Sequence, residues 1–500
     1  MSAGARMRPA ALLLCLVSST ALAQAMPDRV SASGYFRLAA RPDFQGGNGR
    51  LGFWNLYGRL LNEGSYAALE MKLDMLQAAP GTNDLWASVH ARIEGGSVGA
   101  GDSMNGNFLA FRLSQLYVRA GNLLLDKVVW QLGTLVYFFG DLGLYDMRPA
   151  TVFDDTMGLS ARYRNDVVDL TIGIGDSGFF NRGMQYSPML TAGGALRIRI
   201  SEHLEIGGGG QVAYEPTIRG ARFSPHQTPG VRYEDFVRGE VAQRWVEENP
   251  GQELLFPRPV SASQPSLPFR VVGYLGFGKL GPIRWNNLFV RWGRGAPQQS
   301  YVERFGGRDY TIYVADLTRD RYQFLIGNEM QLRIIPDRLD AAWGVLYGDD
   351  TDQADLIRAS ERNRTYMSTV LRLQLYFTRS FHLLMESSIA QERSKNGNLF
   401  REHFDSVFSS TDGISDTRGL QFGDSAVRNT WQGKIGFVLN PMGLGIYARP
   451  SLRLLYGVQY SSQQAAFGNG FSESLAEFNE FPGEERHWHH LISLEAEGWF

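Results

Sequence analysis

Few side chains in this sequence could do chemistry, and the densest group of them is the run HWHH at 487–490. Clustered imidazoles are typical of zinc sites. A strand, however, would place His487 and His489 on one face and His490 on the other, and no carboxylate or cysteine spacing completes a ligand set. The acidic run at 349–355 lacks the glycine and the terminal glutamate of an EF-hand loop. We therefore predict no metal, and favour an aromatic girdle for the first run and a solvated loop for the second.

Two glycine patterns match known motifs only in part. GIGDSG at 173–178 has the spacing of a dinucleotide-binding loop, but FFNRGMQYSPML follows it in place of a helix. Turn glycines are the better interpretation, and no cofactor is predicted. The triplet Gly-Asp-Ser, which begins some esterase motifs, recurs along the chain. A catalytic serine needs a histidine partner, and no histidine stands at a recognisable spacing, so the sequence does not indicate an enzyme.

Aromatic side chains beside charges are harder to explain by packing alone. Tyr35, Tyr66, Tyr447 and Trp499 each share one face of an alternating segment with an arginine or a glutamate. This combination suits sugars, because their C–H faces stack on rings while their hydroxyls bond to charged groups. Packing beneath a loop is an equal alternative for any single ring.

The elements that must position these side chains are strands. In LISLEAEGWF, a period of two puts Leu494 and Phe500 on an apolar face and Glu495, Glu497 and Trp499 on the opposite face. The same division into an apolar face and a charged face is found in three other segments, SGYFRLAA, YAALEMKLDM and IYARPSLRLLY. An apolar face opposite a charged face is what a strand between lipid and a water-filled lumen requires. A soluble sandwich also alternates, but no linker or repeat divides the chain into the domains that it would need.

Residues 1–25 are predicted to be a secretory signal peptide, because arginines precede a short apolar stretch that ends in small residues. Cleavage is expected after Ala25, with Ala23 as the alternative. The single cysteine, Cys15, lies inside this segment, so the mature chain, 26–500, is predicted to contain no disulfide. A formal net charge of −2 gives no reason to expect nucleic acid as a partner.

Two stretches interrupt the alternation. Residues 137–155 follow the strand-like VVWQLGTL, and they are predicted to form a loop that holds both charges and aromatic rings. Residues 215–268 are polar and rich in proline, with one helix-like piece, YEDFVRGEVAQRWVEEN. Barrels keep their long loops outside the cell, so we expect an extracellular insertion there.

Both ends and several interior segments of the chain resemble the maltoporin-type, carbohydrate-selective porins. GYFR at 34–37 is similar to the first strand of that family, GTLVYFFGDLGLYDM to its constricting third loop, and the final WF to its closing aromatic pair. The resemblance implies an all-β, transmembrane antiparallel β-barrel of about eighteen strands, with sixteen remaining open. It also implies a homotrimer in the outer membrane of a Gram-negative bacterium.

The family guides sugars along an aromatic slide and a polar track, and the resemblance implies residues for both. Tyr35, Tyr447 and Trp499 match the slide, and Tyr66 can replace a slide tyrosine that aligns with Ala68. The positions that match the track are Arg37, Arg59, Glu70, Arg112, Asp141 and Asp146.

The predicted function is passive, facilitated diffusion of saccharides or other small polar solutes, without cofactor or catalysis. Phe500 is expected to face the outer-membrane lipid and to direct the chain to the barrel-assembly machinery. Arg148 replaces the tyrosine that narrows the pore in the family. Because rings of arginine favour anions, a general or anion-favouring porin is the alternative. An outer-membrane barrel hydrolase is a distant alternative.

Overall fold

The structure is a computed structural model, and it describes residues 29–42, 44, 50–52, 55–79, 82–96, 111–177, 189–214, 222–225, 231–232, 267–295, 300–305, 308–313, 321–352, 364–395, 427–462 and 487–500. The predicted signal peptide, 1–25, and the helix-like piece at 233–249 lie outside these residues. Within them the only helix is a 3-10 turn, η1 (Asn55–Tyr57). No helix in the described part of the chain is long and apolar enough to cross a membrane.

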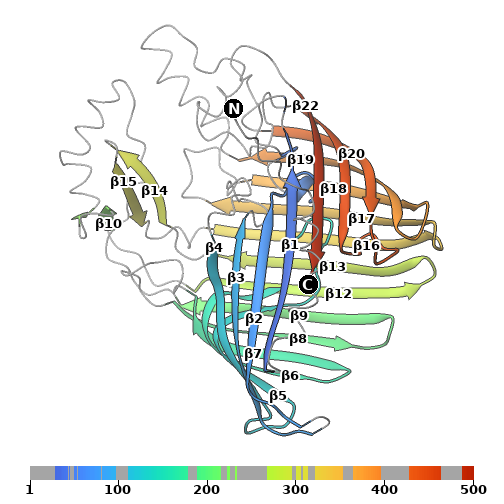
Figure 1. Ribbon diagram of the computed structural model, residues 1–500. Coiled ribbons are helices and arrows are strands. Elements are labelled where there is room, and N and C mark those ends of the chain that lie inside the picture. The colour runs from blue at the N-terminus through green and yellow to red at the C-terminus, as the bar shows by residue number, and fades with distance from the viewer. Residues whose placement is uncertain are drawn as a thin grey trace, which may run out of the picture.

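Eighteen antiparallel strands form one closed β-barrel (Figure 1). Each strand pairs with the next one in the wall, and the last returns to pair with the first, with Trp499 opposite Tyr35. In wall order the strands are β1 (Val30–Ala40), β2 (Tyr66–Leu76), β3 (Trp86–Gly96), β4 (Phe111–Gly121), β5 (Val128–Phe138), β6 (Thr151–Arg164), β7 (Val168–Asp176), β8 (Leu190–Arg199), β9 (Leu204–Tyr214), β12 (Phe269–Leu280), β13 (Ile283–Arg294), β16 (Arg321–Ile335), β17 (Leu339–Asp352), β18 (Arg364–Tyr376), β19 (Phe381–Ser394), β20 (Val427–Leu439), β21 (Ser451–Ser461) and β22 (Trp488–Trp499). The predicted barrel of eighteen strands is confirmed.

The alternation predicted for the last strand is present in the structure. On β22, Leu494 is 49% exposed on the outer face, whereas Glu495 is 2% exposed on the inner face. Phe437 and Leu454 on the neighbouring strands are exposed on the same outer face. This pattern follows because successive side chains of a strand point to opposite sides of the wall.

The apolar outer face places this barrel in an outer membrane. In hydrocarbon each backbone N–H and C=O group needs a partner within the protein, and closure of the sheet gives every strand two neighbours. Short turns join the strands at one end, for example 165–167, 200–203 and 281–282, whereas longer segments join them at the other end. Barrels of this type have short periplasmic turns and long extracellular loops, so these two ends face the periplasm and the outside.

The stretch 215–268 contains two short strands that the sequence did not predict, β10 (Arg222–Pro225) and β11 (Val231–Arg232). They pair with each other, and β10 also pairs with β15 (Arg308–Tyr313), which pairs with β14 (Ser300–Phe305). Figure 1 shows this small sheet apart from the barrel wall. Backbone pairing across two extracellular connections organises these segments, and such pairing has no local sequence signal.

The histidine run lies at the extracellular end of β22, and its side chains diverge. His489 is buried on the inner face, whereas His490 lies on the outer face and bonds to the Tyr456 hydroxyl at 2.7 Å. Trp488 is on the outer face, with its ring 5.0 Å from that of Tyr460. In the described residues no three His, Cys, Asp or Glu side chains are grouped closely enough to hold a metal ion.

Two of the three glycines predicted to form turns at 173–178 lie instead within a strand, and Gly178 lies outside the described residues. Gly173 and Gly175 belong to β7 and face the lumen side of the wall. A Cβ at Gly173 would lie 2.9 Å from Cζ of Phe153, closer than a side-chain carbon tolerates. The glycine is therefore explained by an aromatic ring that packs on the strand.

The described residues of the segment 50–63, which enters the barrel from the extracellular end, cover one side of the lumen. Its leucines Leu51, Leu60 and Leu61 pack against inner-face residues of β19 to β22, such as Leu384 and Leu455. Burial of this apolar surface on the wall stabilises the segment inside the barrel.

A buried ion pair beneath this segment fixes it to the wall. The Lys434 ammonium on β20 is fully buried and donates to the Glu386 carboxylate at 2.7 Å and to the Tyr57 carbonyl at 2.9 Å. Arg372 on β18 bonds to the same carboxylate at 2.6 Å. Asn62 and Gln432 exchange side-chain amide bonds next to this site, at 3.0 and 3.2 Å.

We expect Lys434→Met to release the segment 50–63 from the wall. A methionine keeps the length of the side chain but removes the charge that neutralises Glu386, and breaking a buried pair costs on the order of 3 kcal/mol. Thermal unfolding of the purified barrel should therefore occur at a lower temperature, and its single-channel current should become noisier. The control is Lys127→Met in the exposed turn after β4. Unchanged unfolding and current in Lys434→Met would show that the pair does not hold the segment.

Candidate functional site in the barrel lumen

The structure brings the predicted residues Arg37 and Arg59 together where the segment 50–63 and the loop at 139–150 meet β1 and β22. Arg37 on β1 pairs with Glu63 and donates from Nε to the Gly64 carbonyl at 2.8 Å. Arg59 bonds from Nη2 to Glu497 at 2.5 Å, and its backbone N–H donates to the Leu144 carbonyl at 2.8 Å. Both guanidinium groups are buried, so their first effect is to lock the inward segments in place.

The predicted aromatic residues of β1, β2 and β22 form one contiguous group. The Tyr35 ring lies 4.5 Å from the Trp499 ring and 5.8 Å from the Tyr66 ring, centroid to centroid. The Tyr35 hydroxyl bonds to Glu497, and the Tyr66 hydroxyl donates to Glu94 at 2.8 Å. Trp499 is 60% exposed and therefore offers ring surface to the lumen. Three of the four predicted slide residues thus lie side by side across β22, β1 and β2.

The fourth predicted slide residue, Tyr447, lies elsewhere and is not on a strand. It belongs to the turn before β21, which begins only at Ser451. This turn folds into the barrel from the periplasmic end, and the Tyr447 hydroxyl donates to Glu329 at 2.7 Å. A Cβ at Gly143 of the constricting loop would lie 3.1 Å from the Tyr447 ring. The ring supports this loop from below and does not continue the aromatic group.

The predicted stretch 137–155 contains an inward loop at 139–150, flanked by the end of β5 and the start of β6. Its apolar side chains, including Leu142, Leu144 and Tyr145, are buried against the inner faces of β13 and β16 to β18. Glu329 on β16 accepts from the Leu144 N–H at 2.7 Å. The loop therefore packs one side on the wall and turns its charged side toward the remaining lumen.

Three predicted charges occupy that exposed side of the loop: Asp141, Asp146 and Arg148. Burial raises the pKa of the Asp141 carboxyl above its usual value, although Arg148 opposes the shift. Burial also acts on Asp146, but Arg59 and other guanidinium groups outweigh it and hold the Asp146 pKa below its usual value. Arg148 lies over the Phe138 ring, 4.1 Å from the centroid. The loop thus presents two acids and one arginine to a passing solute.

The other two track residues lie on the wall of β2 to β4. Glu70 contacts the Tyr117 hydroxyl at 3.3 Å and His90 at 3.4 Å. Arg112, near the extracellular end of β4, is paired with Glu94 at 3.4 Å, yet its side chain is 74% exposed. An arginine so exposed inside a barrel is available to solutes.

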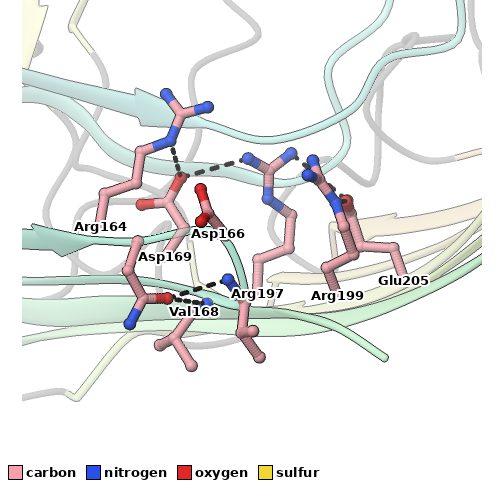
Figure 2. Close-up of a pocket in the computed structure, with 9 residues that line it drawn as sticks. Arg164, Asp166, Val168, Asp169, Arg197, Arg199 and Glu205 are labelled. Atoms are coloured by element: carbon pink, nitrogen blue, oxygen red, sulfur yellow. Dashed lines mark hydrogen bonds and ion pairs between the residues drawn. The ribbon is translucent and has the colours of Figure 1, made fainter. Parts of the chain in front are cut away.

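A basic group on β6 to β9 was not predicted from the sequence. Figure 2 shows Arg197 between the carboxylates of Asp169 and Glu205, at 3.2 and 3.3 Å. Arg164 and Arg199 flank this cluster and keep 63% and 55% of their side chains exposed. The signal was present in SARYR and LRIRI, because arginines two residues apart share one face of a strand.

These arginines line two adjoining cavities at the periplasmic end of the lumen. The first, of about 320 Å³, includes the turn between β6 and β7. The second, of about 460 Å³, extends from Arg197 and Arg199 to Gly140 of the constricting loop. The described lumen therefore contains a charged, solvent-accessible region that begins beneath the loop and opens to the periplasm.

No family model matches the chain, and no curated protein matches it in sequence. Among solved structures it is similar to the outer-membrane channel DcaP of Acinetobacter baumannii, with 8% identity, a TM-score of 0.41 and 94% and 97% of the two chains covered. It is also similar to a BenF-like porin from Pseudomonas fluorescens Pf-5, with 10% identity, a TM-score of 0.43 and coverage of 95% and 99%. OccAB1 of Acinetobacter baumannii has 7% identity, a TM-score of 0.45 and coverage of 94% and 96%. Identities this low carry no argument about function, which must be inferred from the side chains of this chain. The resemblance to maltoporin-type porins stays a prediction.

Glu329 is expected to control the shape of the constriction, because it holds both the loop and the Tyr447 turn. Glu329→Leu leaves the Leu144 N–H and the Tyr447 hydroxyl without this acceptor, a loss of about 1–3 kcal/mol for each buried group. Single-channel conductance in a planar bilayer should rise and fluctuate. Glu329→Gln is the matched control, since its amide can still bond to both groups. Equal conductance of Glu329→Leu and the wild type would contradict this role.

Proposed function

We propose that this outer-membrane barrel is a passive channel that favours small anionic solutes. The observation that carries the proposal is the row of exposed arginines inside the wall. Arg112 lies near the extracellular end of β4, and Arg164 and Arg199 lie at the periplasmic ends of β6 and β8. Arg148 lies on the constricting loop, with its guanidinium over the Phe138 ring at the end of β5.

Charge in a narrow lumen acts more strongly than on an open surface. The apolar barrel wall and the inward segments packed on it reduce the local dielectric constant, so an exposed guanidinium attracts an anion over a longer range than in bulk water. The nearby acids weaken this field but are engaged: Asp169 is held by Arg162 at 2.6 Å and by Arg197 at 3.2 Å. The contacts to a solute stay weak enough for release, as conduction requires.

Saccharides are the second candidate, and the aromatic group of Tyr35, Tyr66 and Trp499 supports them. The exposed Trp499 ring can stack on a sugar, while Glu497 and Arg449, which are 2.7 Å apart, lie beside it and can bond to hydroxyls. Beyond the Trp499 ring the group offers few free polar atoms, because both tyrosine hydroxyls are already bonded to carboxylates. The trimer and the assembly role of Phe500 stay predictions.

Arg148→Gln tests the anion preference at the constriction. Removal of this charge leaves Asp141 and Asp146 on the exposed side of the loop, and we expect the permeability ratio to move toward cations by about fivefold, on the order of 1 kcal/mol. The measurement is the reversal potential in a salt gradient. Arg338→Gln, in an exposed periplasmic turn, makes the same charge change outside the lumen and should leave the ratio unaltered. A cation-selective wild type would overturn the proposed function.

Trp499→Ala tests the saccharide candidate. Loss of one stacking contact should weaken the block of the current by a sugar about threefold to fivefold, as expected for about 1 kcal/mol. Trp488→Ala is the matched control, because Trp488 lies on the same strand with its ring on the outer face. If no sugar blocks the wild type, or if both variants are blocked equally, the aromatic group does not serve as a sugar track.

A further inference from the structure

The larger of the two cavities combines an aromatic ring with charged side chains of both signs. It occupies about 460 Å³ between β8, β9, β12 and β13, and Gly140 of the constricting loop closes its upper side. A volume of this order is typical of small-molecule sites. Its lining combines an indole, Trp285, with basic and acidic side chains at the periplasmic rim.

The indole of Trp285 is held flat against the wall. A Cβ at Gly276 would lie 2.7 Å from Cζ2 of the ring, and a Cβ at Gly278 would lie 2.5 Å from Cε3. Two glycines on the inner face of β12 thus make room for the two ends of one ring, which lies along the strand. Since the ring also lines the cavity, its opposite face is turned toward the space.

Hydrogen bonds fix the orientation of this ring before any ligand arrives. The Trp285 N–H donates to Oδ1 of Asn287, and the Tyr274 hydroxyl donates to the same oxygen at 3.0 Å. The amide of Asn287 in turn donates to the Asp141 carbonyl at 3.0 Å. The platform is therefore rigid and connected to the constricting loop, as a preorganised site requires.

The rim supplies both cations and acceptors. Arg197 and Arg199 face the cavity, and Lys279 stands opposite them, 3.0 Å from Glu202. Glu205 is buried and accepts from Arg197 at 3.3 Å. Guanidinium forks bind carboxylates in a planar, bidentate manner. The carboxylates and Ser201 can accept hydrogen bonds from hydroxyl groups, which a bare aromatic acid does not have.

We propose that this cavity is a binding site for a sugar acid, a pyranose ring that carries a carboxylate. The ring stacks on Trp285, the carboxylate bonds to Arg199 and Lys279, and the hydroxyls bond to Glu205 and Ser201. The site would hold the solute between the constriction and the periplasm. This inference rests on the proposed anion-favouring channel and names a class of solute for it.

The test is the block of single-channel current by sodium glucuronate added from the periplasmic side. Glucose and benzoate are the comparison solutes, because each has only one of the two features that the site recognises. In the wild type we expect glucuronate to block at a concentration at least about fivefold lower than either, because glucose lacks the charge contact and benzoate lacks the hydrogen bonds from hydroxyl groups.

Variants of Trp285 test whether glucuronate blocks the current by binding in this cavity. Trp285→Leu should weaken glucuronate block about fivefold, whereas Trp285→Phe, which keeps a ring, should retain most of it. Trp292→Leu is the matched control, since Trp292 is a half-exposed indole on the outer face of the same strand. Heat-modified migration on a gel checks that each variant is folded.

Two results would overturn this inference. Equal block by glucuronate in Trp285→Leu and the wild type would overturn the site, and block by benzoate as strong as by glucuronate would overturn the sugar acid. The proposed function is tested separately, by the wild-type reversal potential in potassium chloride. An anion-selective channel without glucuronate block would leave the proposed function standing and refute this inference alone.

Discussion

Hydrocarbon does not hydrogen-bond, and the rest of this structure follows from that constraint. Every backbone group within the membrane needs a partner in the protein, and β22 meets this need at the seam by pairing with β1. Because successive side chains of a strand point to opposite sides of the wall, the strands carry apolar side chains toward lipid at every second position. The charged and aromatic side chains that could act on a solute are thereby confined to one interior.

That interior is filled unevenly. The segment 50–63 and the loop 139–150 bury their apolar side chains on β13 and β16 to β22. The exposed arginines instead lie on β4, β6 and β8. The lumen is therefore divided into a packed side, which resembles a protein core, and a charged side, which remains accessible to water and solutes.

Ion pairs fix the inward segments to the wall on the packed side. Glu497 accepts from Arg59 of the inward segment, from Arg449 of the periplasmic turn and from Arg453 of β21, at 2.5, 2.7 and 2.7 Å. Taking such charges out of water costs several kcal/mol, which the ion pairs offset only when every partner is present. The buried network thus gives the inward segments one position, and the position of the segments determines which side chains face the solute.

The sequence by itself determined the barrel, because the period of two in LISLEAEGWF is a local property and assigns each side chain to lipid or lumen. It also indicated the aromatic group, since Tyr35 and Trp499 fall on inner faces. Only the tertiary structure decided that Arg59 is buried and that Tyr447 supports the constricting loop. It also brought Arg164 of SARYR to one cavity with Arg197 and Arg199 of LRIRI, at the periplasmic end of the lumen. These outcomes depend on contacts between residues far apart in the sequence, such as Arg59 and Glu497, which are 438 residues apart. No local sequence pattern predicts which inner-face side chain an inward segment will cover.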